Sequence, residues 1–276
     1  MLLSRLPFEA RIGVTATPMG QGLPRRLYGP LDVLWPGGFG LGYRSFSLRY
    51  CGAVQGEYGT KDEGATNEAE LRARASFLVH EVTRSESHRD LPPLRVESPW
   101  LSVEDLDRAD ADLDKEYSKK VKAADFTSST DLIELQRAAA AAKKRSWVVR
   151  RVLDGLRGGN QKVVLFANRH DHVERWALEI EAGIVASNKT GDPLGDVRVT
   201  WGHGASPASP DARAGLAKDF ADWDGSAVFV GTGQAFGSSL NGFEHADLAV
   251  LAALPWRADE LVQWRGRFDR HGGRPT

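Results

Sequence analysis

The sequence predicts an α/β protein in which helices cover both faces of a parallel β-sheet. Two observations carry that prediction. Short apolar runs rich in β-branched residues recur after residue 160, and segments with helical periodicity separate them. The runs are apolar at consecutive positions, as is typical of strands that are buried on both faces of a parallel sheet. We therefore expect the chain from residue 160 onward to form one α/β domain.

Four segments are expected to form the strands of this sheet, namely residues 163–166, 197–201, 227–230 and 248–251. Helices are expected near residues 171–182, 210–223, 238–244 and 258–265. Ligands of such sheets bind beyond the carboxyl ends of the strands. The loops that follow the four strands are therefore where we expect the functional residues.

The chain before residue 160 is expected to be mainly helical. A strand-like run occupies residues 11–14, and glycine and proline crowd residues 18–42, which predicts loops and short elements there. Helices are expected over residues 68–84, 102–124 and 131–157, the last of them ending at Gly158 and Gly159. We place the domain boundary at the two prolines 92 and 93, which gives domains of residues 1–93 and 94–276.

The composition excludes several classes of protein. Of the 276 residues, 41% are hydrophobic and 26% are charged, which is ordinary for a globular chain. No apolar run approaches the ~18 residues of a membrane span, and the first residues lack the apolar segment of a signal peptide. A single cysteine, Cys51, excludes an internal disulfide and a multi-cysteine zinc site. We expect an intracellular protein, not secreted, without a membrane partner or a metal site of its own.

The loops after the expected strands are glycine-rich, polar and basic. Backbone N–H groups in such loops can cradle phosphates. The net charge is −1, so an anion site must be local, and residues 257–276 contain five arginines against three acids. Arg267 and Arg270 are three residues apart on an expected helix, where they can meet one anion together. These features indicate an α/β domain that binds phosphate groups.

The order and spacing of four segments resemble those of the superfamily-two helicases, and specifically of the Swi/Snf-like translocases on double-stranded DNA. Residues 14–18, Val-Thr-Ala-Thr-Pro, are similar to motif III, and residues 162–168 are similar to motif IV. Residues 232–247 resemble motif V, and residues 255–270 resemble motif VI. This resemblance implies a RecA-like C-terminal lobe, preceded by a mainly helical remnant of the first lobe.

The sequence also departs from that family. It contains no G-x-x-x-x-G-K-[ST] phosphate loop and no Asp-Glu box, and Leu254 replaces an acidic residue often found before the Pro-Trp pair. In the family, the two missing motifs belong to the first lobe, where they hold the nucleotide phosphates and Mg²⁺. The chain therefore resembles the C-terminal half of a motor, whose partner would be an N-terminal lobe carrying the phosphate loop, in cis or in trans.

The resemblance also implies roles for individual residues. The expected arginine fingers, which neutralise charge on the transferring phosphoryl group of ATP, are Arg267 and Arg270. Nucleotide contacts are expected from Gln263, Gly233, Gly237 and Gly266. DNA backbone contacts are expected from Asn168, Arg169, His203, Gly204 and Thr232, and coupling between lobes from Thr15 and Thr17. The Mg²⁺ ligands are expected on the other lobe.

The leading hypothesis is thus the C-terminal part of an ATP-dependent DNA helicase or translocase, which is inactive as an isolated chain. One alternative is a non-catalytic module, a remnant of such a motor that binds nucleic acid or another protein. A third hypothesis is an unrelated α/β enzyme that acts on a phosphate compound.

Some features have two interpretations. The basic residues 143–145, with Arg150 and Arg151, could contact DNA or form a solvated helix face. Trp256 could stack on a base or pack against the last strand. His170 and His172 lack a third metal ligand, so we interpret them as solvated side chains.

Overall fold

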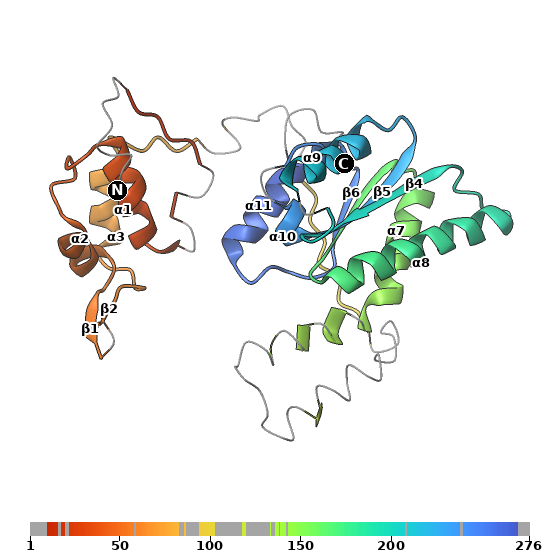
Figure 1. Ribbon diagram of the computed structural model, residues 1–276, viewed down its shortest axis with the longest axis horizontal. Helices are drawn as coiled ribbons and strands as arrows, with labels where there is room; N and C mark the ends of the chain where they lie inside the picture. Colours follow the sequence, from red (N-terminus) through yellow and green to blue (C-terminus); the bar gives the residue numbers. More distant parts are fainter. Residues whose placement is uncertain are drawn as a thin grey trace. The chain divides into compact units, whose positions relative to one another are not determined.

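The computed structural model describes residues 10–15, 18–19, 22–57, 59–82, 86, 94–102, 118–119, 133, 136–137, 139–141, 143–207, 209–237 and 240–269. The chain forms two compact units, one of Met1–Arg89 with Arg257–Asp259 and one of Asp90–Trp256 with Glu260–Thr276 (Figure 1). Most of the helix expected at 102–124 lies outside the described residues. Among the described residues, no helix has both the length and the apolar character needed to cross a membrane.

The elements that the structure describes in full in the first unit are three helices and a β-hairpin. The helices are α1 (Arg25–Leu34), α2 (Tyr43–Tyr50) and α3 (Glu68–Ala75), and the antiparallel strands are β1 (Val54–Gly56) and β2 (Gly59–Lys61). Its core is formed by Leu27, Leu31, Phe39, Phe46, Tyr50, Cys51 and Leu71. This unit therefore has a hydrophobic core of its own.

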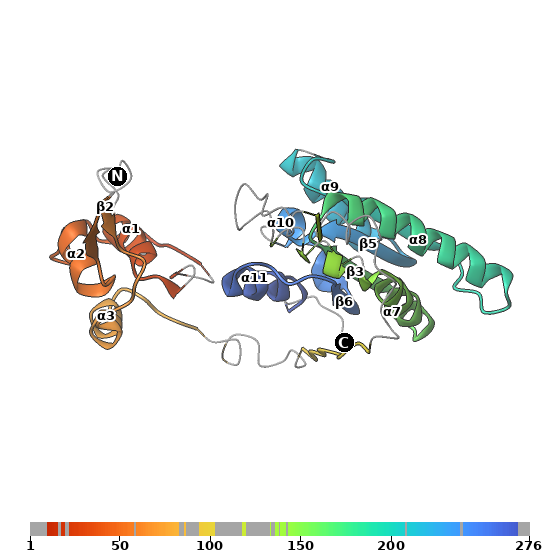
Figure 2. The ribbon, with the colours of Figure 1, turned by 90° about the horizontal axis from the view of Figure 1, so that it is seen from below.

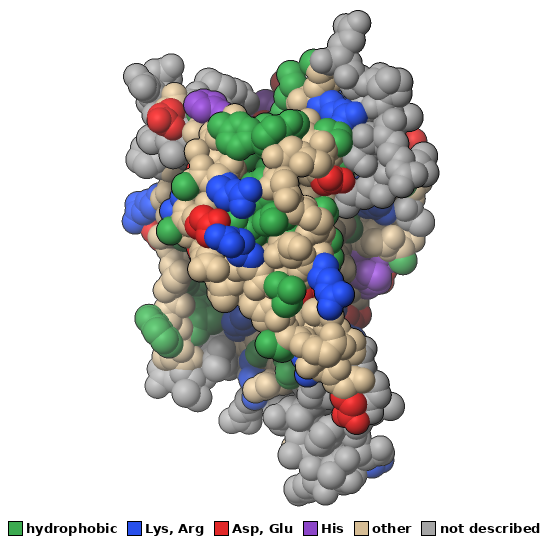
Figure 3. Space-filling model, turned by 90° about the vertical axis from the view of Figure 1, so that its left-hand side faces the viewer, with side chains coloured by type: hydrophobic (Ala, Val, Ile, Leu, Met, Phe, Trp, Pro, Cys, Tyr) green, Lys and Arg blue, Asp and Glu red, His purple; other side chains and the backbone are tan. Residues whose placement is uncertain are grey.

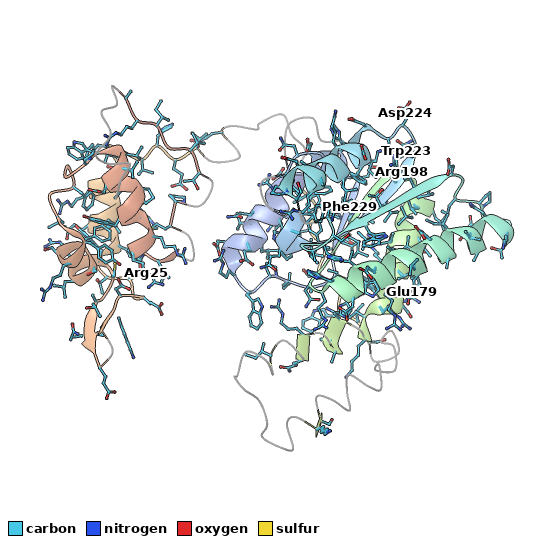
Figure 4. The ribbon with its side chains drawn as sticks, viewed as in Figure 1. Arg25, Glu179, Arg198, Trp223, Asp224 and Phe229 are labelled. Atoms are coloured by element: carbon cyan, nitrogen blue, oxygen red, sulfur yellow. The ribbon has the colours of Figure 1, made fainter. Side chains whose placement is uncertain are left out.

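A polar network ties α1 and α2 to the segment after β2. Arg25, labelled in Figure 4, donates to Asp62 Oδ1 at 3.0 Å and to Glu63 Oε1 at 2.9 Å, and the Tyr43 hydroxyl donates to Asp62 Oδ2. The bond to Asp62, with some burial, raises the pKa of Tyr43 to about 12. The same bond from Tyr43, followed by that from Arg25, lowers the pKa of Asp62. These contacts fix the hairpin to the helices.

The sequence-based description of the first unit needs three corrections. Residues 11–14 form no strand, because a strand needs a hydrogen-bonded partner and none of the described segments pairs with them. The glycine- and proline-rich stretch contains the helix α1, which is held by burial of Leu27 and Leu31 one turn apart. The helix α3 ends at Ala75, where the Ser76 hydroxyl donates to the Ala73 carbonyl and competes with the helical ladder.

The second unit confirms the predicted α/β class. Its four strands are β3 (Lys162–Ala167), β4 (Val197–Gly202), β5 (Ser226–Thr232) and β6 (Leu248–Leu251). They form one sheet in the order β4-β5-β3-β6, and every pairing is parallel. The central strands β3 and β5 are almost completely buried, as their consecutive apolar residues predicted.

Helices cover both faces of this sheet (Figure 1, Figure 2). On one face, α7 (Arg145–Arg157) and α8 (His170–Lys189) bury Val163, Leu165, Val228 and Val230. On the other face, α9 (Pro210–Asp222), α10 (Gly233–Phe236), the 3₁₀ turn η4 (Phe243–His245) and α11 (Ala258–Phe268) bury Val164, Phe166 and Phe229. The residues of each strand thus alternate between two cores.

The amino edge of the sheet is fixed by two charged residues. The Lys162 side chain is 2% exposed, and its ammonium donates to the carbonyls of Phe220 and Trp223 at the end of α9. Asp247 Oδ2 accepts from the backbone N–H groups of Gln161 and Lys162, each at 2.8 Å. A cation at a helix C-terminus and a carboxylate that accepts from backbone N–H groups are both electrostatically favourable. Both charged side chains therefore have a structural role at this edge of the sheet.

Two helix predictions in the second unit had different outcomes. In the stretch 131–157, the described residues are helical except for Lys144, which interrupts the helix just before α7; the helix ends as predicted, with Gly159 at φ +91°. No helix spans 238–244, because the described residues from 240 to 242 are irregular and Gly242 has φ +118°. A Cβ at Gly242 would lie 2.5 Å from the Ala217 carbonyl oxygen, so the chain there passes directly against α9.

Candidate functional site

The four strands end at the same edge of the sheet because they are all parallel. Asn168 and Arg169 follow β3, His203 and Gly204 follow β4, and Thr232 ends β5, directly before α10. Residues predicted to be functional at these strand ends therefore lie along one edge, as expected for a ligand site of an open α/β sheet.

After β3, the chain presents an amide and a guanidinium at the start of α8. Asn168 Oδ1 is buried and has no hydrogen-bond partner in the structure. Arg169 is the N-cap residue of α8, and its Nε donates to Asp171 Oδ1 at 3.0 Å. Burial raises the pKa of Asp171, but the bond from Arg169 and the nearby positive groups outweigh it, so the pKa is lowered. Arg169 thus already has a carboxylate partner, with which a bound phosphate would compete.

Three aromatic rings stack between the end of β4 and the start of α8. The ring of Trp201 lies 6.0 Å from that of His203, and the ring of His203 lies 4.2 Å from that of His170. His203 is 5% exposed, with Nε2 3.1 Å from Glu174 Oε1 and Nδ1 accepting from the Ala205 N–H at 3.2 Å. His203 therefore anchors the loop after β4 to α8, and its direct contact with DNA stays a prediction.

Sequence reasoning missed this stack because it treated both histidines of α8 as solvated. His170 is exposed, but His172 is only 6% exposed and stacks on Trp176 at 5.2 Å, so that interpretation was wrong for His172. The sequence did contain a signal for this contact. His170 and Glu174 lie one turn apart on the same helix, so their side chains can contact one residue of a neighbouring loop together.

After β5, the predicted glycines lie against a tryptophan of α11. A Cβ at Gly233 or at Gly237 would lie 2.2 Å from the indole of Trp264, which is 6% exposed. Both glycines are therefore needed for packing of α10 against α11, and their contact with a nucleotide stays a prediction. The Thr232 side chain is 4% exposed, so it does not face solvent.

The helix α11 presents the remaining predicted residues. Gln263, Gly266 and Arg267 lie three and four residues apart and share one face, whereas Trp264 and Phe268 are buried. Arg267 Nη1 donates to the Leu240 carbonyl at 3.0 Å. Arg270 and Thr17 lie outside the described residues, and Thr15 lies exposed in the first unit. The structure thus brings the segments resembling motifs V and VI into contact.

The basic residues before α7 contact protein groups. Lys144 Nζ donates to the Ala252 carbonyl at 2.9 Å, and burial lowers its pKa. Arg145 Nε lies 3.5 Å from Glu179 Oε2, and Arg151 Nη2 lies 3.9 Å from Glu97 Oε2. Figure 4 labels Glu179 on α8. These contacts favour a structural role for the cluster.

Trp256 is 54% exposed, and the Arg137 guanidinium lies 4.2 Å from its ring centroid. A similar pair, Arg198 of β4 and Trp223 after α9, lies at the opposite edge of the strands, with 5.0 Å between guanidinium and ring (Figure 4). Because one face of the Trp256 ring already carries an arginine, a cation–π contact accounts for this side chain without a nucleic-acid base.

A comparison with known protein families finds no family whose model matches this chain. Within the described ranges, no three His, Cys, Asp or Glu side chains converge in a way that could hold a metal ion. The class that the fold defines is therefore an α/β protein with an all-parallel sheet, and its activity has to be argued from the site.

Proposed function

We propose that the second unit is the C-terminal RecA-like lobe of an ATP-dependent DNA helicase or translocase acting inside the cell. The observation that supports this most directly is the contact between the two segments that resemble motifs V and VI. Trp264 fills the space beside Gly233 and Gly237, and Arg267 is bonded to the Leu240 carbonyl. A conformational change in either segment would therefore be transmitted to the other.

In this proposal, the arginine fingers are Arg267 of α11 and Arg270, which follows in the sequence. A guanidinium beside the γ-phosphoryl group neutralises the charge that develops in the transition state, which can be worth ~10³–10⁵ in rate. ATP and Mg²⁺ would be held mainly by an N-terminal lobe with a phosphate loop. The bond from Arg267 to Leu240 couples the finger to the loop after α10.

The proposed DNA contacts lie at the carboxyl edge of the sheet, at Asn168, Arg169 and Gly204. The stacked rings of His170 and His203 show that the loops after β3 and β4 are adjacent. Contacts to phosphates fix position without reading sequence, so binding should be nonspecific and should weaken with salt.

A partner surface is also supported by the first unit. Ile12 and Val14 belong to the segment resembling motif III, and their side chains are 90% and 94% exposed. Trp35 and Phe77, in edge-to-face contact at 5.0 Å, are 42% and 62% exposed. Figure 3 shows hydrophobic side chains gathered on part of the face that it presents. A contiguous patch of exposed apolar side chains marks a surface that another protein covers, and these residues would belong to it in this proposal.

The test is to mix the full chain with a lobe that carries a phosphate loop and to measure DNA-stimulated ATP hydrolysis. Arg267→Ala and Arg270→Ala should each lower the rate by orders of magnitude. Arg265→Ala, an exposed arginine of α11, is the matched control and should change little. Mg²⁺-dependent hydrolysis by the isolated chain, or an unchanged rate in Arg270→Ala, would overturn the proposal.

The second candidate function is a non-catalytic module that binds nucleic acid. A chain without a phosphate loop of its own is compatible with this alternative as well as with the motor. Salt-dependent DNA binding that is lost in Arg169→Ala, without ATP hydrolysis in the presence of any added lobe, would select this alternative over the motor.

A further inference from the structure

The ring of His170 is held in a fixed orientation at the carboxyl edge of the sheet. It lies 4.2 Å from the ring of His203, with 13° between the two planes. His203 is itself immobilised, because one ring nitrogen bonds Glu174 and the other accepts from the backbone of Ala205. Trp201 continues the stack on β4, 6.0 Å away and at 25°. One face of His170 is therefore supported by two further rings.

The surroundings of His170 leave it accessible. The side chain is exposed, whereas His203 beneath it is 5% exposed. Gly204 follows in the loop after β4, and its Cβ position lies 3.8 Å from His170 Nε2, so this loop runs beside the edge of the imidazole. The preceding residue, Arg169, carries a guanidinium with 39% of its side chain exposed.

We propose that the outer face of the His170 ring is a stacking platform for an unpaired nucleobase. The proposal rests on the proposed nucleic-acid binding and adds a contact to a base. A flat heteroaromatic ring next to a cation matches a nucleotide, since the ring can stack on the base and the guanidinium can meet its phosphate. Every base has a flat face that can stack on an aromatic side chain. The site should therefore distinguish unpaired from paired bases without a preference for a particular base.

The expected selectivity follows from the geometry of a duplex. Bases in a continuous helix have both faces covered by their neighbours, so His170 can stack only on a base that has left the helix or that lies at an end or a bulge. The displaced base exchanges one stacking partner for another, which lowers the cost of leaving the helix. The platform would therefore favour DNA that carries an unpaired base.

The experiment compares binding of the full chain to a fully paired duplex and to the same duplex with one unpaired 2-aminopurine. We expect tighter binding to the second probe and a change in the 2-aminopurine fluorescence as the base leaves its neighbours in the helix. His170→Ala should weaken binding to the second probe by roughly 5- to 150-fold and abolish the fluorescence change, with little effect on the paired duplex. His170→Phe should retain both effects. His80→Ala, an exposed histidine of the first unit, is the control.

Three other results would contradict the stacking platform, and each can be told apart from the others. If the fluorescence change and the preference for the second probe persist in His170→Ala, the stacking platform is refuted and the proposed DNA binding is left intact. If His170→Ala weakens binding to both probes equally, His170 contacts the DNA backbone and not an unpaired base, and the stacking platform is also refuted. If the unaltered chain binds neither probe, the proposed function fails together with the stacking platform. Circular dichroism spectra of the variants verify that each remains folded.

Discussion

Two glycines that the resemblance groups together should respond in opposite ways to the same substitution. Gly233 begins α10, and a Cβ there would lie 2.2, 2.3 and 2.6 Å from three atoms of the Trp264 indole. Carbon atoms at optimal separation are about 3.5–4.0 Å apart, so the indole would have to move by more than ~1 Å. Trp264 is 6% exposed and packs edge-to-face on Phe166, with 5.8 Å between ring centroids, so it has little room to move.

Gly233→Ala should therefore lower the free energy of unfolding by about 1–3 kcal/mol, the usual cost of overpacking. Gly266, in the interior of α11, has no atom within 4 Å of its Cβ position. Gly266→Ala should raise the free energy of unfolding by about 0.4–1 kcal/mol, since alanine restricts the unfolded chain and fits the helix. Urea titrations followed by circular dichroism measure both values.

A double-variant cycle tests the cause. If Trp264 is what the new methyl group meets, Trp264→Leu should cost less in the Gly233→Ala background than in the unaltered chain. Additive costs, a Gly233→Ala variant as stable as the unaltered chain, or a Gly266→Ala variant destabilised by the same amount would refute the packing argument.

Three further predictions concern other parts of the chain. Asp247→Ala removes the acceptor of two backbone N–H groups and should lower the free energy of unfolding by about 2–3 kcal/mol, as measured by urea titration; a neutral result would contradict the role given to this carboxylate. Tyr43 has its pKa raised from 10.0 to about 12, so its stabilising contribution should be complete below pH 10 and lost as pH rises through 12. The same network lowers the pKa of Asp62, so its contribution should be present above the ordinary carboxyl range and lost in acid. An absorbance titration of tyrosinate should show one late-titrating group that Tyr43→Phe removes. Cys51 is fully buried, and burial raises its pKa, so a thiol reagent should react with it only after unfolding.

The strands were predictable because their signal is local and strong. All four expected runs fall within β3, β4, β5 and β6. Consecutive apolar residues suit the central strands β3 and β5, which are buried on both faces, whereas the edge strand β4 is largely not buried and is marked by its β-branched residues. Helix α11 was also found at its expected start. The helix expected at 238–244 was wrong because the approach of Gly242 to Ala217 decides that backbone, and this contact joins residues distant in sequence.

The position of the candidate residues in the fold was predictable, but their burial and their partners were not. Because parallel strands end at the same edge of a sheet, the loops after β3, β4 and β5 lie at one edge, as expected. Strand direction gave no information on burial, so it could not show that Thr232 and His203 are covered. The partners of Lys144 and Arg145 could not be predicted from the sequence either, because they belong to segments far along the chain.

The sequence by itself determined the fold class, the four strands and the edge of the sheet where function is expected, because hydrophobic periodicity and strand direction are properties of the chain. Only the tertiary structure decided that Gly233 and Gly237 make room for Trp264, and that Trp201, His203 and His170 form one stack. Those arrangements depend on which side chains meet across the sheet edge, and close packing selects them only when the whole second unit has folded.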